Sequence, residues 1–130
     1  MLKIILYLLI FTSFDSFAVS LVKVIENDMM TIFVDTDSIR KSENNLTFSE
    51  LLDLKVVHKS SRNIEFQSYA IEVTINCATT YQKVHHIIMY TSNMGKGKEI
   101  ARGRFPNPPR ILLKDAVNFK TMEYVCSRHK

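Results

Sequence analysis

The stretch EFQSYAIEVTINC, residues 65–77, decides the fold of this chain. From residue 68 onward its side chains alternate almost without exception. The apolar parity holds Tyr69, Ile71, Val73, Ile75 and Cys77, and the other parity holds Ser68, Glu72, Thr74 and Asn76. A period of two is typical of a β-strand with one buried face. The pattern therefore predicts a strand over 65–77 that directs Cys77 towards the core.

The segments on either side of this strand show the same period. Residues 21–25 and 31–34 flank Asn27-Asp28, which predicts a hairpin with a polar turn. In the next segment one parity is apolar except for Glu50, and its apolar members are Leu46, Phe48, Leu52, Leu54 and Val56. The run 84–91 is apolar on both parities and predicts an interior strand.

Two glycines and three prolines delimit the last predicted strand. Gly95-Lys96-Gly97 predicts a turn, because glycine adopts positive φ at little steric cost. The last strand is expected over 99–105 and ends at the prolines at 106, 108 and 109, which cannot donate to a ladder.

Beyond the prolines the spacing of apolar residues becomes three or four. One stripe of a helix is predicted to hold Leu112, Ala116, Phe119, Met122 and Cys126. The fold class that follows is α+β, with an antiparallel sheet of about six strands and one C-terminal helix.

The first 20 residues have the layout of a secretory signal. Lys3 precedes an apolar run over 4–14, and small residues follow, which predicts cleavage after Ala18 or Ser20. The run is about a dozen residues long, and a membrane span needs roughly 20. We therefore expect an exported protein with one domain over 21–130, no membrane span and no nucleic-acid partner.

Composition indicates how this domain is stabilised and what it binds. The chain has two cysteines, Cys77 and Cys126, and an even count in an oxidising compartment predicts one disulfide. The formal net charge is +4, a mild excess that concerns partners rather than the fold. Five basic residues could form a stripe for an acidic partner, or could protect a sheet edge from aggregation: Lys96, Lys98, Arg102, Arg104 and Arg110.

No motif in the sequence predicts catalysis. A GxSxG elbow and a glycine-rich phosphate loop are both missing. His85-His86 are adjacent, so on a regular strand the two rings point to opposite faces and cannot chelate one metal. Asp35 and Asp37 are interpreted as turn residues that bind local backbone. We expect no enzyme activity, no metal and no cofactor.

Taken in order, several segments resemble the surface-adhesin protein E family of Gram-negative bacteria. They are FVDTDSI (33–39), LLDL (51–54), the stretch 68–77 that ends EVTINC, MGKG (94–97) and the closing Val125-Cys126. The resemblance extends over nearly the whole mature chain. It implies a six-stranded antiparallel sheet, a C-terminal helix, a disulfide between Cys77 and Cys126, and binding of host matrix and serum proteins.

The sequence departs from the family pattern in three ways, and these keep two functions open. It has no Trp, Asn76 stands where Asp is usual, and no cysteine follows the signal segment to carry a lipid anchor. The first function is that of an exported non-catalytic binding protein that recognises a host or envelope protein. The alternative is a soluble periplasmic accessory protein, such as an envelope-stress, inhibitor or assembly factor. Either could be periplasmic or secreted, surface display stays open, and a homodimer is compatible with both.

Overall fold

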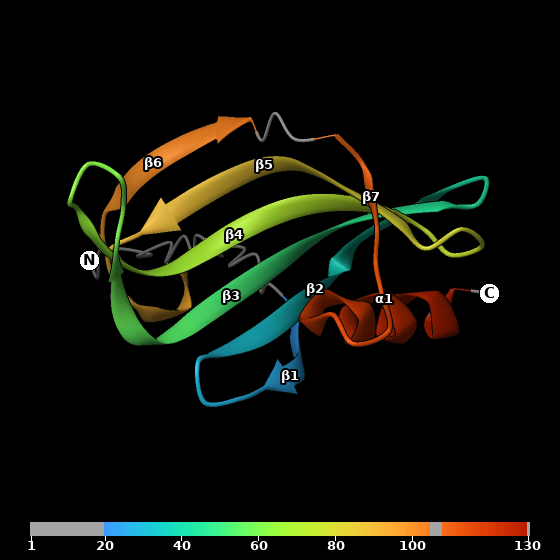
Figure 1. Cartoon of the computed structure of the whole chain (residues 1–130), viewed down its shortest axis with the longest axis horizontal. Coiled ribbons are helices and arrows are strands. Elements are labelled where there is room, and N and C mark those ends of the chain that lie inside the picture. The colour runs from blue at the N-terminus through green and yellow to red at the C-terminus, as the bar shows by residue number, and fades with distance from the viewer. Residues whose placement is uncertain (1–19, 105–107, 130) are drawn as a thin grey trace, which may run out of the picture.

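The computed structural model describes residues 20–104 and 108–129, and in it one antiparallel sheet is joined to one C-terminal helix (Figure 1). The elements are β1 (Leu21–Glu26), β2 (Met30–Ser42), β3 (Asn45–Lys59), β4 (Glu65–Asn76), β5 (Tyr81–Tyr90), β6 (Glu99–Arg104), β7 (Arg110–Ile111) and α1 (Val117–Arg128). Strands β1 to β6 lie in the sheet in chain order, and β7 pairs with β5. The predicted α+β class is confirmed, while the two-residue β7 beyond the prolines was not predicted. The predicted signal segment, residues 1–20, lies outside the described part except for Ser20.

The long strand β4 shows the predicted alternation, with Ile71, Val73 and Ile75 all buried. It ends at Asn76 because that side chain accepts hydrogen bonds from the next turn. The backbone N–H groups of residues 78 and 79 donate to its Oδ1, at 2.9 and 3.1 Å, which is the way Asn favours turns. Cys77 therefore lies exposed in the turn. Its Sγ is directed to Cys126 of the helix on the core face, as predicted, but the residue is not buried in the core.

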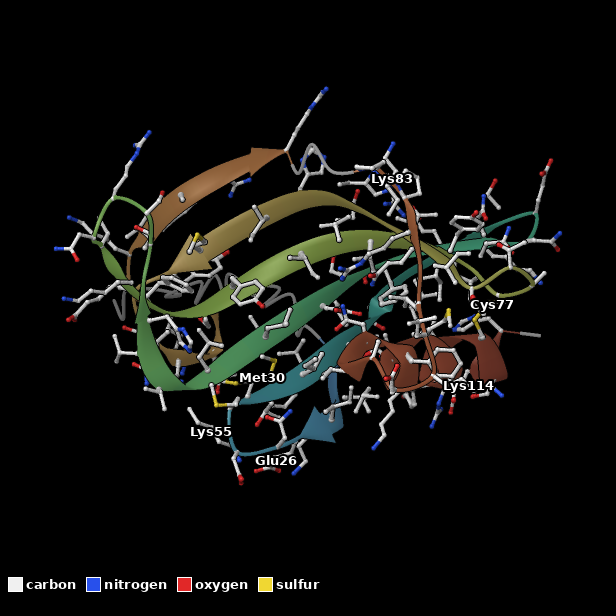
Figure 2. The ribbon with its side chains drawn as sticks, in the orientation of Figure 1. Glu26, Met30, Lys55, Cys77, Lys83 and Lys114 are labelled. Atoms are coloured by element: carbon white, nitrogen blue, oxygen red, sulfur yellow. A yellow bond between two sulfur atoms is a disulfide. The ribbon has the colours of Figure 1, made fainter. Side chains whose placement is uncertain are left out.

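The predicted turns are present. Between β1 and β2, the Oδ1 of Asn27 accepts hydrogen bonds from the backbone N–H groups of Met29 and Met30. An ion pair of 3.2 Å between Lys55 of β3 and Glu26 of β1 joins the two strands near this turn. Figure 2 labels both residues at this end of the sheet. After β5, Gly95 and Gly97 adopt φ of 68° and 78°, the left-handed region that glycine tolerates.

In strand β3, one apolar residue predicted to be buried is exposed, and the one charged residue on the apolar parity is buried. Its register with β4 is irregular between residues 53 and 58, and Val56, predicted on the buried face, is 56% exposed. The charged exception Glu50 is 1% exposed and pairs in register with Val34 and Ile71. A carboxyl group therefore lies inside the apolar core.

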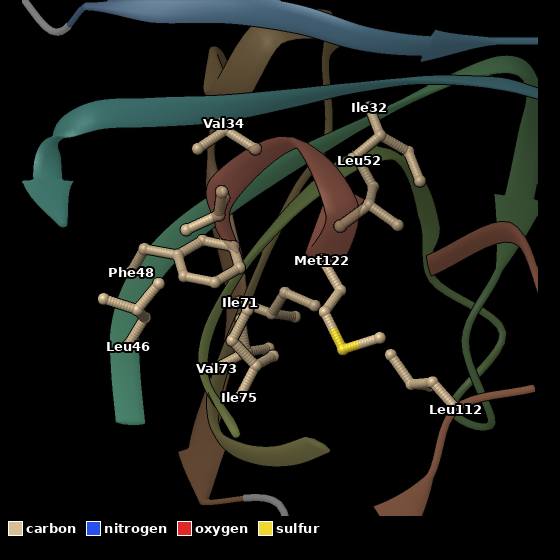
Figure 3. Packing of buried hydrophobic residues seen from close by; sticks show 11 residues of the cluster. Ile32, Val34, Leu46, Phe48, Leu52, Ile71, Val73, Ile75, Leu112 and Met122 are labelled. Carbon is tan, nitrogen blue, oxygen red and sulfur yellow. The ribbon is translucent and has the colours of Figure 1, made fainter. Parts of the chain in front are cut away.

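The core lies between one face of the sheet and α1, as Figure 3 shows. Met122 and Val125 of the helix, 4% and 0% exposed, pack against sheet residues that include Phe48 and Val73. Leu112 is buried as expected but precedes the helix, because its N–H donates to the carbonyl oxygen of Thr80 as the chain leaves β7. Figure 1 shows this connection crossing the sheet to reach α1.

The predicted disulfide between Cys77 and Cys126 is present, with 5.8 Å between the two Cα atoms. It joins the turn after β4 to the last turn of α1 and so holds the helix against the end of the sheet. No helix within residues 20–104 and 108–129 has the length and apolar character needed to cross a bilayer.

Candidate binding surface

The face of the sheet opposite α1, here called the outer face, carries rows of side chains that run across four strands. The register places Ser49, Glu72, His86 and Arg104 in one row and Leu51, Ala70, Ile88 and Arg102 in the next. A shallow depression of about 230 Å³ lies between these rows. The outer face is thus polar at its β6 side and accessible for a partner.

The basic residues of β6 point to this face together. Arg102 and Arg104 are separated by one glycine, so they share a parity, and both are exposed. Glu99 at the start of β6 accepts a hydrogen bond from the guanidinium of Arg102, and this contact lowers the pKa of Glu99. Lys96 and Lys98, also exposed, lie in the turn that leads into the strand. These four cations, Lys96, Lys98, Arg102 and Arg104, are called the basic surface below.

The turn that carries Lys96 is fixed to the outer face by four polar contacts. It contains the short helix η1 (Asn93–Gly95). The carboxylate of Asp53 accepts hydrogen bonds from the Asn93 side-chain amide and from the Met94 N–H, at 2.9 and 2.8 Å. The hydroxyl of Ser68, 0% exposed, donates to the Ser92 carbonyl and accepts from the Gly95 N–H. The turn is therefore held in place, and its lysines have a defined position relative to β6.

Comparison with known proteins agrees with this architecture. A family model for surface-adhesin protein E matches residues 20–127. The chain belongs to the surface-adhesin protein E family. Solved structures of protein E from Haemophilus influenzae resemble it at 15% identity, with TM-scores of 0.61 and, in a second crystal form, 0.63. They match over 83% of this chain and over 84% and 87% of theirs, and no curated protein matches. At this identity the likeness to the solved structures concerns the fold.

In this protein E family member Arg110, the fifth of the basic residues that the sequence grouped, lies apart from the other four. Arg110 is in β7, opposite Gln82 near the start of β5, whereas β6 pairs with the second half of β5. Arg110 lines a cavity on the core face of the sheet instead. The structure therefore groups four of the five basic residues and places Arg110 at a different surface.

The histidine pair departs from the regular strand that the sequence predicted. A bulge in the β4–β5 register lies at this point, with Glu72 opposite His86 and Val73 opposite Val84. The hydroxyl of Thr74, two residues from Glu72, lies 2.7 Å from Nε2 of His85. The bulge thus directs both imidazoles to the outer face, and the expectation of opposite faces is wrong. Within the described ranges no three potential ligands cluster in a way that would hold a metal.

Asp35 binds local backbone as the sequence suggested, whereas Asp37 contacts a distant side chain, and both lie within β2 rather than in a turn. The carboxylate of Asp35 accepts a hydrogen bond of 3.1 Å from the N–H of Asp37, and that of Asp37 accepts one of 2.9 Å from the Ser20 hydroxyl. The β2–β3 register is irregular from residue 35 to 40. These carboxylates therefore shape a bulge, which accounts for both residues.

Sequence reasoning missed two features of the core face. The first is a cavity of about 460 Å³ bordered by β2 to β5, β7 and the start of α1. A linear pattern gives no signal for it, because its walls come from six elements. The second is the environment of Glu50: both carboxyl oxygens are buried without a hydrogen-bond partner among the described residues. Burial raises the pKa of this carboxyl to about 8.

Proposed function

We propose that this protein E family member is an exported, non-catalytic binding protein that presents its basic surface to a protein ligand of the host matrix or of the bacterial envelope. The observation that carries the proposal is the grouping of four exposed cations on β6 and its preceding turn. Glu99 is the single carboxylate contributed by this segment, residues 93–104. The family membership supports the same assignment.

The chemistry of the surface favours an acidic segment on the ligand. Exposed lysines and arginines gain little from one isolated ion pair, since water and salt screen it. Several like charges held together create a field that speeds association and selects acidic partners. Arg102 is oriented by Glu99, so its guanidinium is partly ordered before a ligand arrives.

Surface plasmon resonance against a panel of extracellular-matrix and serum proteins tests the proposal. The test variant replaces the four residues of the basic surface with Gln. The matched control replaces four exposed cations elsewhere, Lys41, Lys114, Lys120 and Arg128. We expect the test variant to lose most of the salt-sensitive association rate and the control to keep it, because rim charges act mainly on association.

The same experiment contains the result that would overturn the proposal. If no panel protein binds saturably, or if test and control variants bind alike, adhesion through the basic surface is wrong. An unchanged affinity combined with faster aggregation of the test variant would assign the cations to protection of the β6 edge instead.

Localisation is the second part of the proposal. We infer export from the N-terminal signal layout, and the chain then resides in the periplasm, in the medium or on the surface. Protease treatment of intact cells, followed by release of the periplasm, separates these compartments. Digestion on intact cells supports surface adhesion. Protein released only by opening the outer membrane favours the accessory role instead.

A further inference from the structure

The core face of the sheet is only partly covered by α1, and a cavity of about 460 Å³ lies beside the start of the helix. Its walls come from four neighbouring strands, from β7 and from the start of the helix. The described lining residues are Met30, Leu52, Leu54, His58, Phe66, Tyr69, Ile71, Val84, Ile87, Met89, Arg110, Val117 and Asn118. This volume is within the range of about 300–1,000 Å³ that is usual for small-molecule sites.

The lining has the composition of a site for an aliphatic chain. Nine of the thirteen described residues are Leu, Ile, Val, Met or Phe. Leu52, Leu54 and Ile71 form its floor and are 4%, 4% and 8% exposed. Apolar walls with a small number of polar groups are typical of pockets that fix the orientation of an amphipathic ligand.

The charged and polar groups at the cavity favour an anion. Arg110 is the one residue of the described lining with a permanent charge, and none of that lining is acidic. The ion pairs found among the described residues do not include Arg110. Nε2 of His58, buried without a hydrogen-bond partner among those residues, lies at the other end of the cavity, where β3 pairs with the start of β4, and takes no part in the anion site. A carboxylate would pair with the guanidinium in the geometry that Arg favours.

One buried carboxyl group lies close to the cavity and is compatible with an anion in it. Glu50 precedes Leu52 on the same face of β3 and pairs in register with Ile71. Burial raises the pKa of Glu50 to about 8, so the group is mostly protonated at neutral pH. It therefore adds little negative potential to the site.

We propose that this cavity binds a medium-chain aliphatic carboxylate, with the chain against Leu52, Leu54 and Ile87 and the carboxylate at Arg110. The proposal concerns the core face and is independent of protein binding at the outer face.

Isothermal titration of the purified chain with decanoate and with decanol tests the proposal. We expect saturable binding of decanoate and weaker binding of decanol, since the alcohol cannot pair with Arg110. Arg110→Gln should weaken decanoate binding by about tenfold, the size of a lost hydrogen bond to a charged group. Arg104→Gln, which removes an exposed arginine from the outer face, should leave it unchanged. No saturable decanoate binding, or equal binding of acid and alcohol by parent and variant, overturns the proposal.

A second measurement locates the ligand without any substitution. In methyl NMR spectra, intermolecular NOEs from the methylene protons of bound decanoate should reach the methyl groups of Leu54 and Ile87, which line the cavity, and should not reach those of Ile88, which lies on the outer face. NOEs to Ile88 instead would place the ligand on the wrong face and refute the site.

Discussion

The buried carboxyl of Glu50 makes the stability of this fold depend on pH in an unusual direction. Its side chain is 1% exposed and has no hydrogen-bond partner among the described residues, and desolvation raises its pKa from 4.5 to about 8. The unfolded chain releases this proton at a lower pH than the native chain does. Above about pH 4.5 the unfolded state is therefore favoured progressively, until the native carboxyl also ionises near pH 8.

The magnitude follows from the separation of the two pKa values. Each pH unit between them lowers the free energy of unfolding by about 1.4 kcal/mol. Between about pH 5 and about pH 7.5 the contribution of Glu50 should fall by about 3 kcal/mol, which corresponds to a melting temperature lower by on the order of 10 °C.

Urea denaturation of the disulfide-bonded protein at these two pH values measures the effect. Glu50→Gln keeps the shape of the side chain and removes the ionisation, so its gain over the parent should be about 3 kcal/mol larger at the higher pH. Glu72→Gln, at a partly exposed position of the neighbouring strand, serves as the control and should follow the parent. The reasoning is refuted if the parent and Glu50→Gln lose the same stability between the two conditions.

Three further predictions concern the disulfide, the turn before β6 and the core. Replacing Cys77 and Cys126 with Ser should lower the free energy of unfolding by about 4 kcal/mol, the loop-closure cost for a bridge that spans 49 residues; equal melting temperatures with and without reductant would contradict this. Gly97→Ala places a Cβ against two hydroxyls at a positive φ and should destabilise by at least about 1 kcal/mol, whereas Gly103→Ala meets open space and should be tolerated; thermal melts compare the pair. Met122→Ala should cost about 2–5 kcal/mol in urea denaturation, because the side chain is 4% exposed in the core; a loss below about 1 kcal/mol would mean that the helix packs loosely.

Most of the sheet could be predicted from the sequence, because strict alternation fixes both the strand and the face that is buried. The prediction for 65–77 was correct for Ile71, Val73 and Ile75 and failed only in the burial of Cys77, where an Asn side chain bonds to the following backbone and ends the strand. Bulges limited the prediction elsewhere. An inserted residue changes the face of everything beyond it, which explains the error at His85.

The basic surface and the cavity were harder to predict from the sequence than the sheet was. Lys96, Lys98, Arg102 and Arg104 are close in the chain and fall together, so the sequence could group them. Arg110 was grouped with them by proximity alone, yet it follows the prolines and pairs with the start of β5. The cavity beside α1 was invisible because its walls are assembled from distant segments.

The order of strands has a consequence for how the protein folds. Since β1 to β6 are neighbours in both chain and sheet, each new strand can pair with the one that has just emerged, and few long loops need to close. The exception is the terminal helix, whose Cys126 must return to Cys77. The disulfide can therefore form only once the terminal helix is present, so a chain truncated before Cys126 should accumulate as a paired sheet without its covalent link.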